Sequence, residues 1–331
     1  MKAVCSFSGG LDSMLAAKIM VEEGIEVEAL YFKTGFGGCG EIENALPVRQ
    51  RAESLGVKMT VVDVSAELLK IISAPQYGFG KNMNPCMDCH ALFFRKCYEY
   101  MEKLGASFIV TGEVVGERPM SQRKWAMMEI DRFTGLEGLI LRPLSARIMP
   151  PTIPEKKGWV NRENLFAISG RSRKPQRLLA QRFGIKSYPN AAGGCLLTEK
   201  DFSRKLKDIM EHRSVLTERD IALLRTGRHF RLSPEAKLVI GRDERENERL
   251  LKLAARDDIR FATVDVPGPV GVLTGGASER DQQTAASVIS SYSDAEHPEE
   301  VLVAREYGVS GKKEQSLVKS CPRKKFKKHL I

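Results

Sequence analysis

The sequence predicts an α/β protein: a Rossmann-like, doubly wound parallel sheet with a smaller C-terminal α+β domain. The first ~110 residues alternate short apolar runs with segments of helical periodicity, which is typical of parallel strands covered by helices on both faces. A glycine-rich turn, SGGLDS at 8–13, joins the first strand to the first helix. Because crossover connections are right-handed, this order leaves a doubly wound topology.

The N-terminal elements follow from their apolar patterns and the turns that bound them. Strands are expected at 2–7, 26–32, 58–64 and 107–111. Helices are expected at 14–24, 43–55 and 90–104, the last ending before Gly105. The proline-rich stretch 149–159 is expected to be a loop.

The second half of the chain has a different pattern. Helices are expected at 173–183, 200–213 and 217–225, before the pattern changes at about residue 226. Short strand-like runs then combine with two helical segments, as in an α+β domain. The runs are RHFRL, AKLVIG, RFATVDV, VGVLT and VLVAR, and the helical segments are 243–255 and 281–292.

The net charge of +10 is unevenly distributed. Residues 155–190 and 312–328 each carry a net charge of +7, which leaves the rest of the chain at −4. Two basic patches on a slightly acidic body indicate a polyanionic partner. A solubilising or disordered end is the competing explanation for the C-terminal patch, and the last ~20 residues are expected to be loosely ordered.

Apolar run length argues against a membrane location. No run approaches the ~18 residues that span a bilayer, and the N-terminal run is too short for a signal peptide. We therefore expect a cytoplasmic protein. Its seven cysteines then predict metal, redox or catalytic use rather than a disulfide framework.

The SGGLDS turn is the strongest functional signal. Its glycines allow the backbone to approach a ligand closely, and the first amides of the following helix favour an anion. Asp12 fits beside phosphate if it holds a Mg²⁺ ion. The pattern lacks the lysine of a Walker A motif. It resembles the pyrophosphate loop of the PP-loop ATP pyrophosphatases, which cleave ATP to AMP and pyrophosphate and adenylate an oxygen atom.

A second constellation is formed by cysteines. Cys86 and Cys89 form a Cys-x2-Cys after Asn-Pro, and Cys195 follows in a later glycine-rich stretch. A Cys-x2-Cys is typical of half a zinc site or of a redox pair. Cys97 or His90 could complete a zinc site, whereas Cys5 and Cys97 fit packing positions, Cys39 stays open and Cys321 is expected to be incidental.

Together, the turn and the cysteines resemble the PP-loop tRNA thiolation enzymes over residues 1–210. The resemblance implies either a persulfide mechanism using Cys86 and Cys195, or a [4Fe–4S] cluster held by Cys86, Cys89 and Cys195. The presence of Cys89 favours the cluster. The resemblance also implies ATP and Mg²⁺ as cofactors, with catalytic roles for Asp12, Cys86 and Cys195. It assigns ATP binding to Ser8, Gly9, Gly10, Leu11, Asp12, Ser13, Thr111 and Gly112.

Glu113 follows Gly112 where this superfamily commonly carries histidine, so no catalytic role is assigned to it. The basic residues near 171 suit phosphate groups of ATP or RNA. The C-terminal half, with Gly-Arg-x4-Asn at 241–247, resembles the NFACT-type RNA-binding domain. The residues expected to bind RNA are Arg171, Arg173, Lys174, Arg228, His229, Arg242, Lys324, Lys325, Lys327 and Lys328.

The expected organisation is a PP-loop ATP-binding domain at 1–148, a basic helical linker carrying Cys195 at 149–215, an RNA-binding domain at 216–310 and a basic tail at 311–331. The expected activity is ATP-dependent tRNA uridine thiolation, a sulfurtransferase reaction. The expected partners are tRNA and a sulfur donor (a cysteine desulfurase, a sulfur carrier or sulfide), and a homodimer stays open. The alternatives are another adenylating PP-loop reaction, such as amidation, lysidine or nitrile formation, and a non-catalytic RNA-binding protein.

Overall fold

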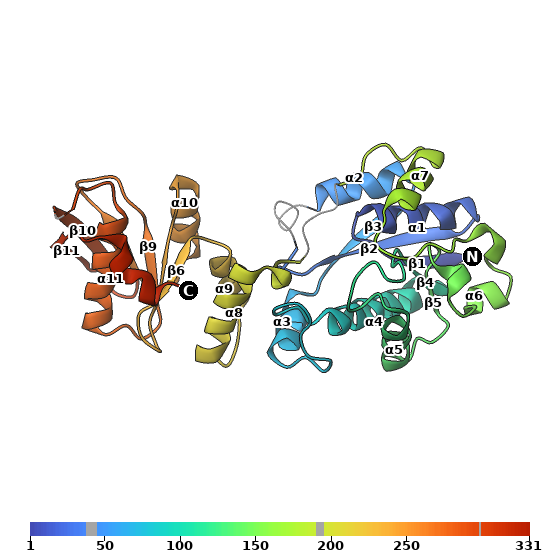
Figure 1. Cartoon of the computed structure of the whole chain (residues 1–331), viewed down its shortest axis with the longest axis horizontal. Helices are drawn as coiled ribbons and strands as arrows, with labels where there is room; N and C mark the ends of the chain where they lie inside the picture. The colour runs from blue at the N-terminus through green and yellow to red at the C-terminus, as the bar shows by residue number, and fades with distance from the viewer. Residues whose placement is uncertain (38–44, 190–194, 298) are drawn as a thin grey trace. The chain divides into compact units, whose positions relative to one another are not determined.

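The computed structural model describes residues 1–37, 45–189, 195–297 and 299–331. It consists of two compact units, Met1–Thr198 and Glu199–Ile331 (Figure 1). The segment 149–215, expected as one linker region, is therefore divided between the two units. In the described ranges, no helix is both long and apolar enough to cross a membrane.

Within the described residues, the sheet of the N-terminal unit has five parallel strands in the order β3-β2-β1-β4-β5. Because the order reverses at β1, the loops after β1 and β4 meet at a topological switch point, where such sheets bind ligands. This confirms the expected doubly wound α/β fold. The strands are β1 (Lys2–Ser6), β2 (Glu26–Lys33), β3 (Lys58–Asp63), β4 (Phe108–Thr111) and β5 (Ile140–Leu141).

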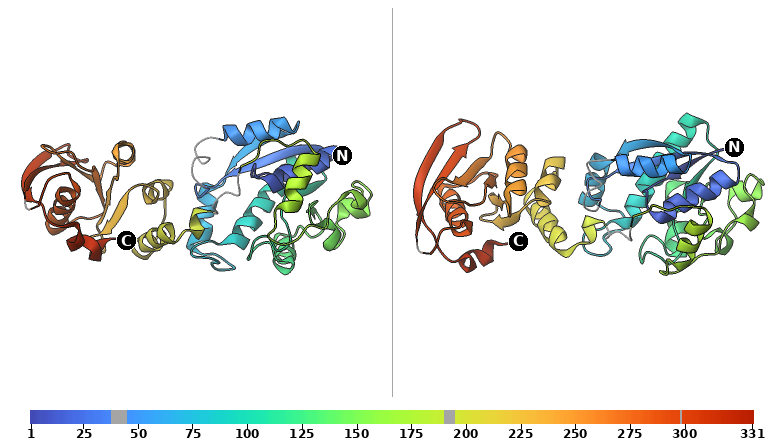
Figure 2. Two further views of the ribbon diagram at one scale, coloured as in Figure 1. Left: turned by 45° about the horizontal axis from the view of Figure 1, so that its top comes forward. Right: turned by 90° about the horizontal axis from the view of Figure 1, so that it is seen from above.

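Helices cover both faces of this sheet, as Figure 1 and the further views of Figure 2 show. One face is covered by α1 (Leu11–Glu22), α2 (Leu46–Ser54) and α7 (Lys174–Arg182). The other is covered by α3 (Ser65–Ser73), α4 (Cys86–Leu104) and α5 (Lys124–Thr134).

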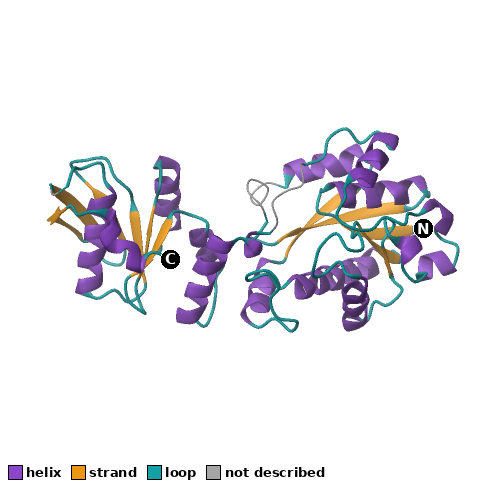
Figure 3. Cartoon of the chain, viewed as in Figure 1, coloured by secondary structure: helices purple, strands orange, loops and turns teal. Residues whose placement is uncertain are grey.

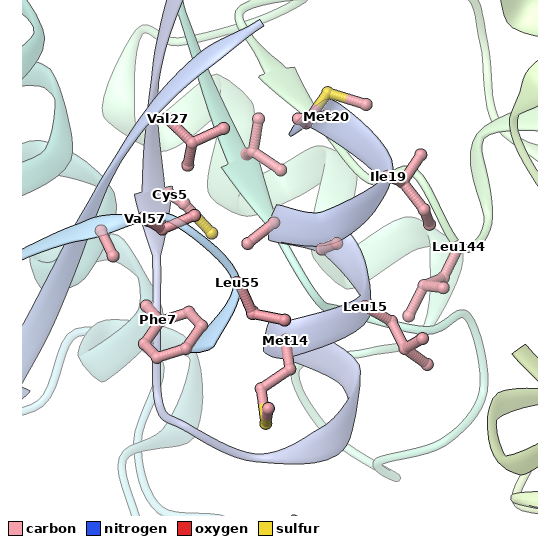
Figure 4. Close-up of a cluster of buried hydrophobic side chains, with 14 of the residues drawn as sticks. Cys5, Phe7, Met14, Leu15, Ile19, Met20, Val27, Leu55, Val57 and Leu144 are labelled. Atoms are coloured by element: carbon pink, nitrogen blue, oxygen red, sulfur yellow. The ribbon is translucent and has the colours of Figure 1, made fainter. Parts of the chain in front are cut away.

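Alternation along β1 creates these two cores, since successive strand side chains point to opposite faces. Cys5 packs with Met14 and Ile19 of α1 (Figure 4), whereas Val4 packs in the cluster of α4 and α5. Shorter helices complete the unit. They are α6 (Ile153–Lys156) within the expected loop 149–159, and the 3₁₀ turns η1 (Ala146–Ile148), η2 (Arg162–Asn164) and η3 (Leu196–Thr198).

Helix α4 begins four residues before the expected helix at 90–104. Its first turn closes by a hydrogen bond from the Cys89 amide to the Pro85 carbonyl, 2.9 Å. The Cys-x2-Cys therefore lies in the first helical turn rather than in the loop before it.

The C-terminal unit is an antiparallel sheet with helices, which confirms the expected α+β domain (Figure 3). In the described part of this unit the strand order is β11-β10-β8-β9-β7-β6. The helices are α8 (Lys200–His212), α9 (Glu218–Leu224), α10 (Glu244–Leu253) and α11 (Glu279–Tyr292). The strands are β6 (Arg228–Arg231), β7 (Lys237–Ile240), β8 (Ile259–Thr263), β9 (Gly271–Thr274), β10 (Glu300–Tyr307) and β11 (Lys313–Lys319).

The basic C-terminal end is folded, contrary to the expected loosely ordered tail. β11 pairs with β10 along its whole length, and the 3₁₀ segment η4 (Arg323–His329) follows. Phe326 is buried in the core of this unit and anchors η4. The segment is poor in apolar residues because β11 is an edge strand with exposed side chains at alternate positions.

Candidate active site

The SGGLDS turn connects β1 to α1 at the switch point of the sheet. Gly9 has a φ of +71°, and a Cβ there would lie 2.8 Å from Val48 Cγ1. The Ser13 hydroxyl donates to the Gly10 carbonyl at 2.9 Å and lies 3.3 Å from the Ser8 hydroxyl. The N-cap residue of α1, Gly10, has no side chain that could cap the first amides of the helix, and amides at this position favour an anion.

The end of β4 packs directly against the start of α1. A Cβ at Gly112 would lie 2.4 Å from both the Ser13 nitrogen and the Asp12 carbonyl carbon. Only glycine permits this approach, which places buried Thr111 beside the turn.

Asp12 points into a polar site that the described residues leave incompletely satisfied. Its Oδ1 is buried and lacks a hydrogen-bond partner in the described part of the chain, as do Gln122 Oε1 and Arg173 Nε. Burial raises the pKa of Asp12, and the positive charge of Arg173 opposes this increase. Arg173 Nη2 lies 3.8 Å from Asp12 Oδ2. Unsatisfied buried oxygens beside free helix amides fit Mg²⁺ and a phosphate chain.

A cavity of about 450 Å³ joins this turn to the cysteines. It lies within the N-terminal unit, at the carboxyl ends of β1 and β4. Most of the residues predicted for the site line this cavity. Gly9 and Leu11 do not line it, and the side chain of Leu11 packs in the core instead. The predicted residues that line the cavity are Ser8, Gly10, Asp12, Ser13, Cys86, Cys89, Thr111, Gly112 and Cys195.

Cys86 is the first residue of α4 and has polar neighbours. Its thiol donates to the Ser121 hydroxyl at 3.1 Å, and that hydroxyl lies 3.3 Å from His90 Nε2. Burial raises the pKa of Cys86, but hydrogen bonding to His90, the charge of His90 and the bond to Ser121 outweigh it, so the pKa is lowered. The N-terminal end of a helix also favours a thiolate.

His90 is held by a buried chain of charges. His90 Nδ1 lies 2.7 Å from Glu113 Oε1, and Arg142 Nε donates to Glu113 Oε2 at 2.8 Å. Arg142, 3% exposed, also donates to both carboxylate oxygens of Asp131 at 2.8 Å. Burial lowers the pKa of His90, but its bonds to Cys86 and Glu113 raise it to about 10.

Sequence reasoning assigned no catalytic role to Glu113 and considered His90 only as a zinc ligand. The four-residue spacing of Cys86 and His90, one helical turn, is the signal that connects them. No comparable signal connects them to Ser121 or Arg142, whose contacts depend on the tertiary fold.

Cys89 and Cys195 differ chemically from Cys86. Cys89 is buried, and this burial, followed by the proximity of Cys195 and Cys86, raises its pKa well above the ordinary value. Although the three thiols share one cavity, the described residues contain no group of three histidine, cysteine or carboxylate side chains arranged to hold a metal ion. The described residues therefore give no support to the predicted [4Fe–4S] cluster.

The remaining cysteines have other surroundings. Cys5 and Cys97 are buried core residues, and burial raises the pKa of Cys5 to about 12. Cys321 lies 3.3 Å from the Ser291 hydroxyl. Cys39 lies outside the described residues.

The residues predicted to bind RNA are in diverse environments. Arg171 and Lys174 are exposed, whereas Arg173 turns toward Asp12. On η4, the side chains of Lys324, Lys325, Lys327 and Lys328 are exposed.

In the C-terminal unit the prediction for His229 is wrong. It is buried, with Nε2 3.0 Å from the Thr226 carbonyl, and burial lowers its pKa. Arg228 lies over the Tyr292 ring, 5.4 Å from its centroid, and Arg242 pairs with Glu246. Asn247 of the Gly-Arg-x4-Asn motif accepts a hydrogen bond from the Val270 amide at 2.9 Å, so this residue stabilises the fold.

Two family models match the chain. Residues 1–132 match the model described as the tRNA methyl transferase HUP domain, and residues 227–330 match that of the NFACT protein RNA binding domain. The first match covers the turn, Cys86, His90 and Glu113. The second covers β6 to η4.

Curated relatives are tRNA-specific 2-thiouridylases named MnmA. The chain is 36% identical over 119 residues to that of Sulfurimonas denitrificans, which covers 34% of this chain and 35% of that protein. It is 24% identical over 221 residues to that of Pseudomonas fluorescens (strain SBW25), which covers 63% of this chain and 55% of that protein. The chain thus spans about a third to about half the length of these relatives.

A solved structure, the "Crystal structure of a 4-thiouridine synthetase - RNA complex with bound ATP", is 17% identical and covers 56% of this chain and 51% of that one. Its TM-score of 0.34 is too low to carry an argument. The family models confirm the resemblance predicted for both halves: an N-terminal domain similar to tRNA-modifying HUP domains and a C-terminal domain similar to NFACT RNA-binding domains.

Proposed function

We propose that this chain is an ATP-dependent tRNA uridine thiolase, a sulfurtransferase that releases AMP and pyrophosphate. One observation carries the proposal: a single cavity joins the SGGLDS turn to Cys86, Cys89 and Cys195. The similarity to 2-thiouridylases and to an RNA-binding domain supports it.

ATP would lie with its phosphates on the turn and on the free amides of α1. Ser8 and Ser13 would donate to phosphate oxygens, and Asp12 would hold Mg²⁺ through its unpartnered Oδ1. When bound, Mg²⁺ neutralises phosphate charge and orients the chain for displacement. Arg173, beside Asp12, adds a fixed positive charge at the same site.

The reaction begins when a uridine carbonyl oxygen attacks the α-phosphorus of ATP and pyrophosphate leaves. The adenylated oxygen is then a good leaving group. A sulfur nucleophile attacks the same ring carbon, and AMP leaves with the oxygen. The site contributes mainly positioning and charge neutralisation.

We assign the persulfide to Cys195 and the second sulfur nucleophile to Cys86. The terminal sulfur of the Cys195 persulfide attacks the activated carbon. The Cys86 thiolate then attacks Cys195 Sγ, which breaks the persulfide S–S bond, leaves sulfur on the base and forms a Cys86–Cys195 disulfide. A cellular dithiol reduces this disulfide, and a cysteine desulfurase or a sulfur carrier then transfers sulfane sulfur to Cys195. Sulfide would resupply sulfur by a different step: it attacks the Cys86–Cys195 disulfide before reduction, which forms the Cys195 persulfide and releases the Cys86 thiol. The low pKa of Cys86 suits it to this attack, whereas the raised pKa of buried Cys89 does not.

A [4Fe–4S] cluster on Cys86, Cys89 and Cys195 is the competing source of sulfur. The iron and sulfide content of the purified protein distinguishes the two routes. A cluster gives about four irons and four sulfides per chain after anaerobic purification. On the persulfide route the active protein contains neither in stoichiometric amount.

The proposed partner is tRNA, bound in the cytoplasm. The exposed lysines of η4, with Arg171 and Lys174, are the proposed phosphate contacts. Whether the chain forms a homodimer is a prediction that a mass measurement in solution can test. The limits of the functional domains are a separate prediction, which truncated chains can test.

The test incubates the full chain with tRNA, ATP, Mg²⁺ and a cysteine desulfurase with cysteine, and measures thionucleoside, AMP and pyrophosphate. Asp12→Asn should abolish AMP release and thiolation. Cys86→Ser and Cys195→Ser should abolish thiolation but keep pyrophosphate release, because pyrophosphate leaves before the sulfur step, and Cys321→Ser is the matched control.

Other outcomes select the alternatives. AMP release with full activity of Cys86→Ser would indicate a different adenylating reaction, such as amidation, lysidine or nitrile formation. RNA binding that is identical in the parent and Asp12→Asn, without any ATP turnover, would indicate a non-catalytic RNA-binding protein.

A further inference from the structure

Asn82 has an unusual backbone conformation close to the cysteines. With a φ of 57°, it is the one non-glycine residue with positive φ in the described part of the chain. Asparagine tolerates this left-handed conformation better than most residues. Such conformations persist where the surrounding structure holds them, and they often accompany functional sites.

The side chain of Asn82 reaches a segment distant in sequence. Asn82 Nδ2 donates to the Thr198 carbonyl at 2.7 Å. Beside it, the Met83 amide donates to the Leu197 carbonyl at 3.1 Å. The loop that leads into α4 is thus joined to the segment 195–198.

The same segment is attached to the sheet. The Leu196 amide donates to the Phe36 carbonyl, beyond the end of β2, at 3.1 Å. Within the segment, the Thr198 amide and hydroxyl both donate to the Cys195 carbonyl, at 2.8 Å and 2.7 Å. The position of Thr198 therefore determines the position of Cys195.

Both sides of this junction carry the reactive sulfurs. Cys86 begins α4 four residues after Asn82, and Cys195 lies three residues before Thr198. Asn82 is exposed and does not line the cavity, so it acts on the site only through these neighbours.

We propose that Asn82 is a positioning residue: its bond to Thr198 holds Cys195 opposite Cys86 and Cys89. The proposal rests on the proposed sulfur transfer for its biological meaning. Its geometric content, the proximity of the thiols, is measurable without any thiolation activity.

The test measures disulfide formation between Cys195 and either Cys86 or Cys89 in the full chain. The reduced protein is exposed to a mild oxidant, quenched at intervals, and the linked peptides are quantified by mass spectrometry. Two variants separate the contributions. Asn82→Asp keeps the shape but has no donor, and Asn82→Gly keeps access to positive φ but has no side chain.

Both variants should form the Cys195 disulfide more slowly by roughly fivefold, the change expected when one hydrogen bond is lost. Alkylation of Cys195 in the reduced protein should keep its rate, which would show that the thiol itself is unaltered. Lys81→Ala, in the same loop and exposed, is the matched control and should behave like the parent. Melting temperatures identify any variant that has lost its fold.

Disulfide formation at the parent rate in folded Asn82→Asp and Asn82→Gly would overturn the proposal. Failure of the parent to form a Cys195 disulfide would also overturn it. If the parent never thiolates tRNA but both variants slow the disulfide, the positioning role stands and the proposed function fails.

Discussion

Contact with His90 is the largest cause that lowers the pKa of Cys86. Burial acts to raise the pKa of Cys86, and hydrogen bonding to His90 is the largest opposing cause. In His90→Gln, burial is left without this opposition, so the pKa of Cys86 should rise above its ordinary value. The rate of iodoacetamide alkylation at Cys86, followed by peptide mass spectrometry against pH, should therefore shift to higher pH.

The control is His212→Gln, which changes an exposed histidine of the other unit. Its alkylation profile should overlay that of the parent. An unchanged profile in His90→Gln would mean that Cys86 does not depend on this imidazole.

The same histidine predicts a pH dependence of stability. Its pKa is raised in the folded protein from 6.5 to about 10, so the folded state binds the proton more tightly than the unfolded state. This stabilisation is complete below about pH 6.5 and is lost as the pH rises through about 10. Because the lowered pKa of Cys86 contributes stability in the opposite direction over this interval, the comparison uses a Cys86→Ser background, where Glu113 still acts to raise the pKa of His90. The difference in urea-unfolding free energy between Cys86→Ser and Cys86→Ser/His90→Gln should shrink as the pH rises above about 6.5. A difference that stays constant or grows would contradict the assignment.

At the scale of elements, the contact between the end of β4 and the start of α1 sets the geometry of the proposed ATP site. Gly112→Ala would place a methyl group 2.4 Å from the Ser13 nitrogen. The two elements must separate, at a cost of about 1–3 kcal/mol. We expect weaker ATP binding by calorimetry and a lower melting temperature.

Gly135→Asn is the comparison for this substitution, because Gly135 ends α5 with a φ of 71° and nothing lies near its Cβ position. Asparagine accepts that conformation. Equal ATP binding in Gly112→Ala and the parent would show that the turn tolerates the displacement.

The element η4 carries five of the eight basic residues of the second basic patch, 312–328, in a folded segment. Deletion of 312–331 would remove β11 from the sheet, so substitution is the cleaner change. Replacing Lys324, Lys325, Lys327 and Lys328 with Gln should weaken tRNA binding and leave ATP binding unaltered. The slope of log K against log salt should fall by up to about 3–4, if each lysine contacts one phosphate. An unchanged slope would place the RNA elsewhere.

At the scale of the whole molecule, each unit has its own sheet and its own buried core. We expect residues 199–331 alone to fold and to bind tRNA with a salt-dependent affinity that ATP does not alter. Circular dichroism and filter binding measure this. A fragment that is unfolded by circular dichroism would show that its stability depends on the N-terminal unit.

Most of the architecture follows from local sequence patterns. The turn at 8–13 and the buried strands around it are local signals, and they were sufficient to predict the sheet and the position of the turn in it. The polar strand β11 was missed because an edge strand exposes alternate residues and resembles a disordered tail. His229 was predicted to lie at the surface because the sequence shows that its side chain is polar, but it does not show that the fold buries it.

The cysteines of the candidate site were predicted from the sequence, but the buried charged residues beside them were not. Cys86, Cys89 and Cys195 stand out by residue type, and they do line one cavity. The chain from His90 through Glu113 to Arg142 joins residues from separate elements, so only the tertiary structure reveals it.

The buried position of Arg142 constrains how related sequences can diverge. One guanidinium pairs with both Glu113 and Asp131, with His90 as the second positive charge beside Glu113, and loss of one member of such a buried set costs about 3–5 kcal/mol. A lineage that loses the arginine is left with two buried carboxylates. Positions 113, 131 and 142 should therefore change together among relatives, with neutral residues at all three or charges at all three, and position 90 should follow the identity of position 113.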